Sequence, residues 1–178
     1  MRVFKAIAAF MAFAVIALLG YAATRPDIFR VQRSASIKAT PDKLYPLIND
    51  IRNFNTWNPF NRKDPSMKGT YRGPAAGPGA AFDFEGNSEV GKGTVSITGG
   101  TPARAVNMKL DMTEPMQAHN DIEFLLVPRG DMTYVTWTMQ GPCPYLGKLM
   151  GVIFDMDKMV GGEFDMGLAL LKAQAEKS

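Results

Sequence analysis

The sequence predicts an α+β protein in which an antiparallel sheet wraps a long C-terminal helix, preceded by one N-terminal transmembrane helix. Three observations carry this prediction. The N-terminal segment is apolar and almost uncharged, the middle of the chain alternates apolar and polar residues between turn residues, and the C-terminal segment repeats apolar residues at helical spacing. With 46% hydrophobic and 21% charged residues, the 178-residue chain otherwise has the composition of an ordinary globular protein.

The N-terminal segment predicts a membrane anchor. Residues 6–23 contain no charged side chain, and a helix of this length, roughly 27 Å, just crosses the hydrocarbon core of a bilayer. We therefore assign residues 1–26 to the anchor and residues 27–178 to a second domain. We expect a single-pass membrane protein, in the inner (cytoplasmic) membrane if the organism is bacterial. The anchor residues are Ala6, Phe10, Phe13, Ile16, Leu19 and Tyr21.

A cleaved signal peptide is the alternative for this segment, and it would make the mature protein an exported one. The basic start, the apolar middle and the small residues Ala22 and Ala23 fit that pattern. The apolar run is longer than a usual signal core, however, and the bulky Tyr21 makes a poor cleavage site. These two features favour the anchor.

The next part of the chain predicts a strand, two short helices and then an antiparallel sheet. The strand covers residues 29–39, with Val31, Arg33, Ala35 and Ile37 on one face. Thr40-Pro41 starts a helix to about residue 50, and a second helical piece covers residues 51–60. Turn residues then separate the strands expected at residues 68–72, 80–85, 93–98, 106–112, 121–127 and 133–139.

The C-terminal segment predicts one long amphipathic helix over residues 145–177. Its apolar residues recur at spacings of three, four and seven. Gly161-Gly162 is expected to bend the helix. The concave face of the sheet offers a large partner for this apolar stripe.

Composition argues against several classes of partner. The chain has 20 Lys and Arg against 17 Asp and Glu, and Arg2 and Lys5 lie in the anchor, so the remaining body is close to neutral. A neutral body without a basic run is not that of a nucleic-acid binder. A single cysteine, Cys143, and a single histidine, His119, exclude a zinc site built from Cys and His alone. We expect no metal and no cofactor.

Candidate catalytic residues are few, and we assign none. His119 stands in a polar stretch before a strand, and the carboxylate pairs Asp83/Glu85 and Asp121/Glu123 alternate with apolar residues, so both pairs should face water. Asp157 falls within the apolar stripe of the C-terminal helix. A buried carboxylate there would mark a functional site, whereas the favoured alternative places it at the rim, paired with a basic side chain.

Four strings carry a resemblance to a known family: TPDKLYPLIND with FNTWNPF, EGNSEVGKGTVSIT, HNDIEFLLVPRGDMTYVTWTMQG and MGVIFDMDKMVGGEFDMGLALLK. They resemble the START-like (SRPBCC) superfamily, in particular membrane-anchored polyketide cyclase/dehydrase-type proteins. The resemblance implies a helix-grip fold, in which the sheet curls around the C-terminal helix and leaves an apolar cavity. It also implies binding or transport of lipids or other hydrophobic molecules, and some relatives are cyclases.

The apolar strand faces and the helix stripe together predict which residues line that cavity. They are Phe82, Phe84, Met108, Leu110, Ile122, Phe124, Val135, Trp137, Met139, Met150, Ile153, Asp157 and Phe164. We expect membrane-anchored binding of a lipid or other hydrophobic small molecule. The alternatives are a polyketide cyclase or isomerase-like enzyme that uses the same cavity, and an interaction module whose core is filled by its own side chains.

Overall fold

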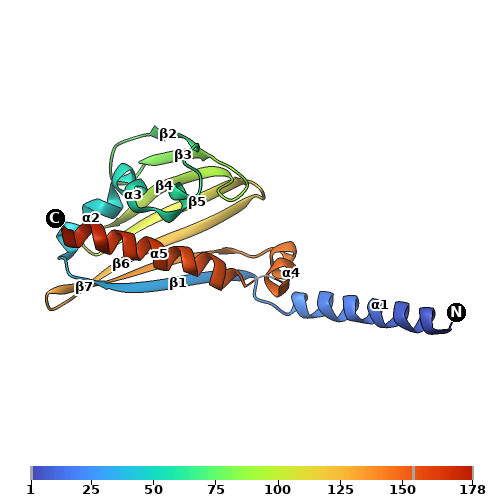
Figure 1. Cartoon of the computed structure of the whole chain (residues 1–178). Helices are drawn as coiled ribbons and strands as arrows, with labels where there is room; N and C mark the ends of the chain where they lie inside the picture. Colours follow the sequence, from blue (N-terminus) through green and yellow to red (C-terminus); the bar gives the residue numbers. More distant parts are fainter. Residues whose placement is uncertain (1, 154, 178) are drawn as a thin grey trace.

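The fold is a seven-stranded antiparallel sheet gripping a long C-terminal helix, with one apolar helix at the N-terminus (Figure 1). The computed structural model describes residues 2–153 and 155–177. The strand order is β1-β7-β6-β5-β4-β3-β2, so the first strand of the domain pairs with the last. The predicted α+β helix-grip class is therefore confirmed.

Each predicted strand is present, and most are longer than predicted because the hydrogen-bonded ladder continues into flanking polar residues that carry no apolar alternation. The strands are β1 (Ile28–Ile37), β2 (Lys68–Arg72), β3 (Ala81–Glu85), β4 (Lys92–Thr101), β5 (Ala105–Glu114), β6 (Ala118–Arg129) and β7 (Met132–Pro142). Ala35 of β1 lies opposite Val135 of β7, and Phe124 of β6 lies opposite Trp137 of β7. This register places the apolar side chains of neighbouring strands on the same face.

Two short helices and a 3-10 turn follow β1: α2 (Pro41–Asn49), α3 (Ile51–Trp57) and η1 (Pro59–Arg62). Asp50 separates α2 from α3, because its carboxylate accepts hydrogen bonds from the backbone N–H groups of Arg52 (2.8 Å) and Asn53 (3.2 Å). We call the face of the sheet that α3, η1 and the C-terminal helix cover the inner face, and the opposite face the outer face.

The C-terminal segment forms two helices rather than the one predicted, α4 (Tyr145–Ile153) and α5 (Met156–Lys177). The interruption does not lie at Gly161-Gly162, where a bend was predicted, because α5 runs through both glycines. The chain instead restarts at Asp155, whose carboxylate accepts a hydrogen bond from the backbone N–H of Lys158 at 3.0 Å and so caps the new helix.

Two glycines of α5 let the helix lie close against the rest of the domain. A Cβ atom at Gly161 would overlap the guanidinium of Arg33 on β1. A Cβ atom at Gly167 would lie 2.7 Å from Cζ3 of Trp137 and 3.0 Å from Cδ of Pro59. The absence of a side chain at Gly161 and Gly167 therefore allows α5 to pack closely against Arg33, Trp137 and Pro59.

The N-terminal helix α1 (Arg2–Ala23) extends from the end of the domain at which α4 lies (Figure 1). Its segment Val3–Ala23 is long and apolar enough to cross a membrane, a property that a signal sequence shares. The predicted anchor residues Phe10, Phe13, Ile16, Leu19 and Tyr21 are exposed, and the side chain of Ala6 lies outside the described part.

Candidate functional site

The inner face of the sheet brings most of the predicted cavity residues together in one apolar layer. Phe84 and Leu110 are partly buried and pack against this layer. Its fully buried members from the predicted set are Phe82, Met108, Ile122, Phe124, Val135, Trp137, Met139 and Phe164. Strand alternation thus places each predicted strand residue on the predicted face.

Aromatic rings fill the middle of this layer. Trp137 of β7 stacks on Phe164 of α5 with ring centroids 4.0 Å apart and planes 6° apart. Phe54 and Trp57 of α3 meet Phe124 and Trp137 edge to face. The prediction that Trp57 is a core residue is confirmed, and its indole N–H donates to the carbonyl of Leu47 at 2.8 Å.

Two buried polar atoms of the inner face have no hydrogen-bond partner among the described residues. They are the indole Nε1 of Trp137, a residue 2% exposed, and Oδ1 of Asn120, a residue 7% exposed. Buried polar groups normally have partners, so these two atoms are exceptions, and neither residue lines the two hollows described below.

Asn120 is a candidate residue that the sequence analysis missed. Alternate residues of a strand face the same side of the sheet. Asn120 lies two residues before Ile122, in step with Phe124 and Leu126, so the sequence pattern places it on the inner face. Its side chain covers Gly141 of β7, since a Cβ atom there would overlap Oδ1. Gly141 in turn lies opposite Phe29 of β1, so the amide extends toward the β1 edge.

Asp157 lies at the rim of α5 and pairs with a base, as the favoured interpretation of the sequence expected. Nη2 of Arg33 lies 2.9 Å from its carboxylate, and Nε of Arg33 lies 3.3 Å from the carboxylate of Asp165, about two helical turns further along α5. The hydrogen bond from Arg33 lowers the pKa of Asp157, and the charge of Arg33 acts in the same direction against the opposing effect of burial. The carboxylate is therefore ionised at neutral pH.

A hollow of about 620 Å³ opens between β1 and the two C-terminal helices, and we call it the α4 hollow. Apolar side chains from β1 and α4 line it together with charged side chains from the linker, β1, α4 and the start of α5. The lining residues are Arg25, Pro26, Ile28, Phe29, Arg30, Val31, Cys143, Gly147, Lys148, Gly151, Val152, Asp155 and Asp157.

The α4 hollow lies at one end of the predicted helix–sheet interface rather than at its centre. Phe29 and Val31 belong to the inner face, and Asp157 is the member of the predicted set that lines it. Met150 points to the exposed side of α4, and the side chain of Ile153 lies outside the described part. The centre of the interface holds the aromatic rings.

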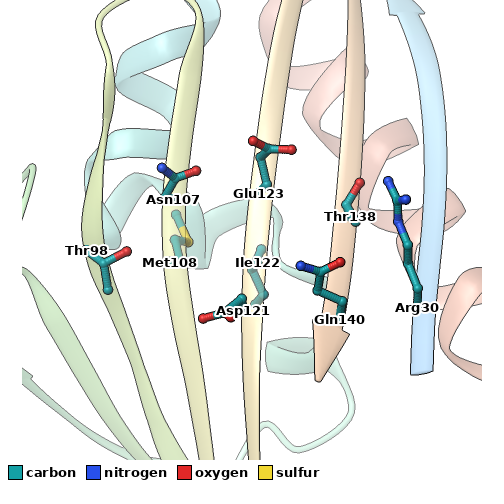
Figure 2. A pocket seen from close by; sticks show the side chains of 9 residues that line it. All are labelled: Arg30, Thr98, Asn107, Met108, Asp121, Ile122, Glu123, Thr138 and Gln140. Atoms are coloured by element: carbon teal, nitrogen blue, oxygen red, sulfur yellow. The ribbon is translucent and has the colours of Figure 1, made fainter. Parts of the chain in front are cut away.

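A second hollow, of about 390 Å³, lies on the outer face across five strands (Figure 2). Figure 2 shows Arg30, Asn107, Glu123, Thr138 and Gln140 side by side over this face. Its lining is mainly polar, so it does not suit an apolar ligand. Asp121 and Glu123 are exposed here, as predicted.

The described residues show no candidate metal centre, and the single histidine lies away from the inner face. They contain no group of three or more His, Cys, Asp or Glu side chains that could hold a metal ion. His119 is exposed on the outer face, with its Nδ1 2.6 Å from the carboxylate of Asp111. This pair stands apart from the inner face.

Comparison with known proteins gives a family and a fold. Residues 29–176 match the family model described as polyketide cyclase/dehydrase and lipid transport. A comparison of the sequence with curated proteins found no match.

Among solved structures, the chain is similar to the Aha1 dimer of Colwellia psychrerythraea, with 19% identity, a TM-score of 0.56, and coverage of 81% of this chain and 93% of that chain. It is similar to protein CV1439 of Chromobacterium violaceum, with 13% identity, a TM-score of 0.59, and coverage of 85% and 99%. A protein from the dynemicin biosynthetic locus matches with 13% identity and a TM-score of 0.56, over 85% of this chain and 48% of that chain. These likenesses concern the fold, and the matched model shows that the chain belongs to the polyketide cyclase/dehydrase and lipid transport family of START-like proteins.

Proposed function

We propose that this protein is anchored in a membrane by α1 and binds a lipid or other hydrophobic small molecule without converting it. The α4 hollow is the observation that carries the proposal. It has room for a small molecule, it joins apolar inner-face residues to α4, and it lies at the end of the domain from which α1 extends. The family description supports the same class of ligand.

The length of α1 supports the anchor. Its 21-residue apolar segment measures roughly 32 Å as a helix, against a hydrocarbon core of about 30 Å. Thr24, Arg25 and Pro26 follow at once, so the linker to β1 is short. The α4 hollow, lined by Arg25 and Pro26, therefore sits next to the membrane surface.

The polar lining of the hollow supports a ligand with a hydrogen-bonding group. Arg25 and Lys148 line it together with the carboxylate of Asp155. Charged side chains of both signs can donate hydrogen bonds to a polar headgroup or accept them from it. We therefore favour an amphiphile over a pure hydrocarbon.

The state of Asp157 favours binding over catalysis. A cyclase or isomerase in this cavity would need a group that exchanges a proton near neutral pH. Arg33 lowers the pKa of Asp157 and occupies its carboxylate, which opposes a role as general acid. The packed aromatic centre supports the other alternative, an interaction module with a filled core, and the experiment below separates it from ligand binding.

Photocrosslinking in a bilayer tests the proposal on the full chain. The protein would be reconstituted in nanodiscs that contain a diazirine-bearing phospholipid, and crosslinked peptides would be mapped by mass spectrometry. We expect crosslinks in α1, which faces lipid, and also at Phe29 and Val31, which lipid reaches through the α4 hollow. Crosslinks confined to α1 would contradict the binding site and favour the filled core.

A matched pair of variants makes this test specific. A Cβ atom at Gly151 or at Gly162 meets no atom within 4 Å, and Gly151 lines the α4 hollow whereas Gly162 is exposed on α5. We expect Gly151→Leu to fill the hollow and to abolish crosslinks at Phe29 and Val31. Gly162→Leu makes the same change in a helix away from the hollow and should leave those crosslinks intact. Equal crosslinking in both variants would exclude the α4 hollow as the route.

A further inference from the structure

Helix α4 exposes an apolar surface to the outside of the domain. Tyr145, Leu146 and Met150 are 47%, 55% and 38% exposed. The single charged residue of the helix is Lys148, whose side chain is largely buried with its ammonium 2.5 Å from the carboxylate of Asp27. The exposed side of α4 is therefore apolar, and we call Tyr145, Leu146 and Met150 the α4 apolar patch.

This patch is joined to the end of α1. The hydroxyl of Tyr145 donates a hydrogen bond to the carbonyl of Leu19 at 2.9 Å. Ala22, in the last turn of α1, is fully buried, and Figure 1 shows α4 beside the end of α1 where the chain enters the domain. If α1 spans a bilayer, its last turn reaches the interface, and α4 is held at that depth.

An adjacent side of α4 faces the interior of the domain. Gly147 and Gly151 line the α4 hollow, and they lie one helical turn apart on the side next to Leu146 and Met150. Helix α4 thus lies between the α4 hollow and the medium that surrounds the end of α1.

We infer that α4 lies in the interface of the same membrane that α1 crosses, with Leu146 and Met150 among the lipid chains. This inference rests on the proposed anchoring by α1. The exposed apolar face of a helix can insert into the boundary between headgroups and acyl chains, and tyrosine is enriched at that depth. The continuity of the patch with α1 selects a lipid surface over a second copy of the chain or another protein. Ligand then enters the α4 hollow from the bilayer past α4.

Depth-dependent quenching on the full chain tests the inference. In a Cys143→Ser background, which removes the single cysteine, single cysteines would replace Leu146, Met150, Phe13 or Lys109 and carry an environment-sensitive fluorophore. Phe13 lies at the middle of α1, and Lys109 is exposed on the outer face. Phosphatidylcholine vesicles would contain lipids with a nitroxide either near the headgroup or near the chain end.

At positions 146 and 150 we expect the shallow nitroxide to reduce fluorescence to less than half, and the deep nitroxide to have a smaller effect. Position 13 should respond most to the deep nitroxide, and position 109 to neither. Quenching at 13 with none at 146 and 150 would overturn the inference while leaving the anchor in place. Blue-shifted but unquenched emission at 146 and 150 would assign the patch to a protein partner and also overturn it. No quenching at 13 would contradict the anchor itself, and the inference with it.

Discussion

At the scale of single residues, the pairing of Arg33 with Asp157 explains two anomalies of the sequence at once. Arg33 interrupts the apolar face of β1, and Asp157 interrupts the apolar stripe of the C-terminal segment. Each position was predictable from periodicity. The pairing between them was not, because it depends on α5 passing close to β1 at Gly161, a tertiary contact that spacing along one chain does not encode.

Asp83 gives a pH prediction at the same scale. Hydrogen bonds from Arg72 and from Thr94 (2.6 Å) lower the pKa of Asp83 from 3.8 to about 2. Because the unfolded state binds more protons between these values, the ion pair stabilises the fold above about pH 4, and the stabilisation is lost as the pH falls toward 2. The side chain is 37% exposed, so solvent screening reduces the contribution to about 1 kcal/mol.

Urea denaturation of the full chain in a mild detergent checks this prediction. Asp83→Asn should lower the free energy of unfolding by about 1 kcal/mol at pH 7, and the two curves should converge near pH 2. A difference that persists unchanged at pH 2 would show that the ion pair is not its cause. Asp121→Asn, with its exposed carboxylate on β6, provides a comparison away from β3.

At the scale of secondary-structure elements, the seating of α5 on β1 predicts opposite effects for neighbouring glycines. Replacing an exposed helical glycine by alanine stabilises a helix by up to about 1 kcal/mol, and Gly162→Ala should do so because nothing lies within 4 Å of its Cβ position. Gly161→Ala should lose this gain, because its methyl group displaces the guanidinium of Arg33 from Asp157 and Asp165.

Thermal unfolding of the two variants provides the measurement. Gly162→Ala should raise the melting temperature, and Gly161→Ala should leave it unchanged or lower it. In an Arg33→Ala background, the two glycine substitutions should become equivalent. If Gly161→Ala stabilises the parent protein as much as Gly162→Ala does, the close approach of Arg33 to α5 is contradicted.

Most elements were predictable from the sequence, whereas the α4 hollow was not. Alternation identified each strand, and helical spacing identified the apolar stripe that contains Phe164 and Leu168. The same spacing continues across the break at Asp155, so it predicts one helix where the fold has two. The hollow forms where α4 and α5 run in different directions. The spacing of apolar residues predicts one continuous helix, so it could not predict that Gly147, Gly151 and Val152 line a hollow.

At the scale of the whole molecule, the proposed division into anchor and domain predicts how the full chain and the isolated domain partition between membrane and solution. The full chain should stay in the membrane pellet after an alkaline carbonate wash, because the proposed anchoring buries the apolar surface of α1 in lipid. Residues 27–178 expressed without α1 should remain in solution as a folded domain, since their apolar core lies within the sheet and its helices. Release of the full chain by carbonate, or a mature chain that begins near Thr24, would contradict the anchor.

The central claim is that the α4 hollow holds a hydrophobic molecule, and mass spectrometry of molecules that co-purify with the detergent-extracted full chain tests it most directly. An unrelated single-span protein purified in the same way supplies the background. We predict that at least one amphiphile exceeds this background, that Gly151→Leu removes it, and that Gly162→Leu retains it. A wild-type preparation with no molecule above background, or an amphiphile retained equally by both variants, would contradict the claim.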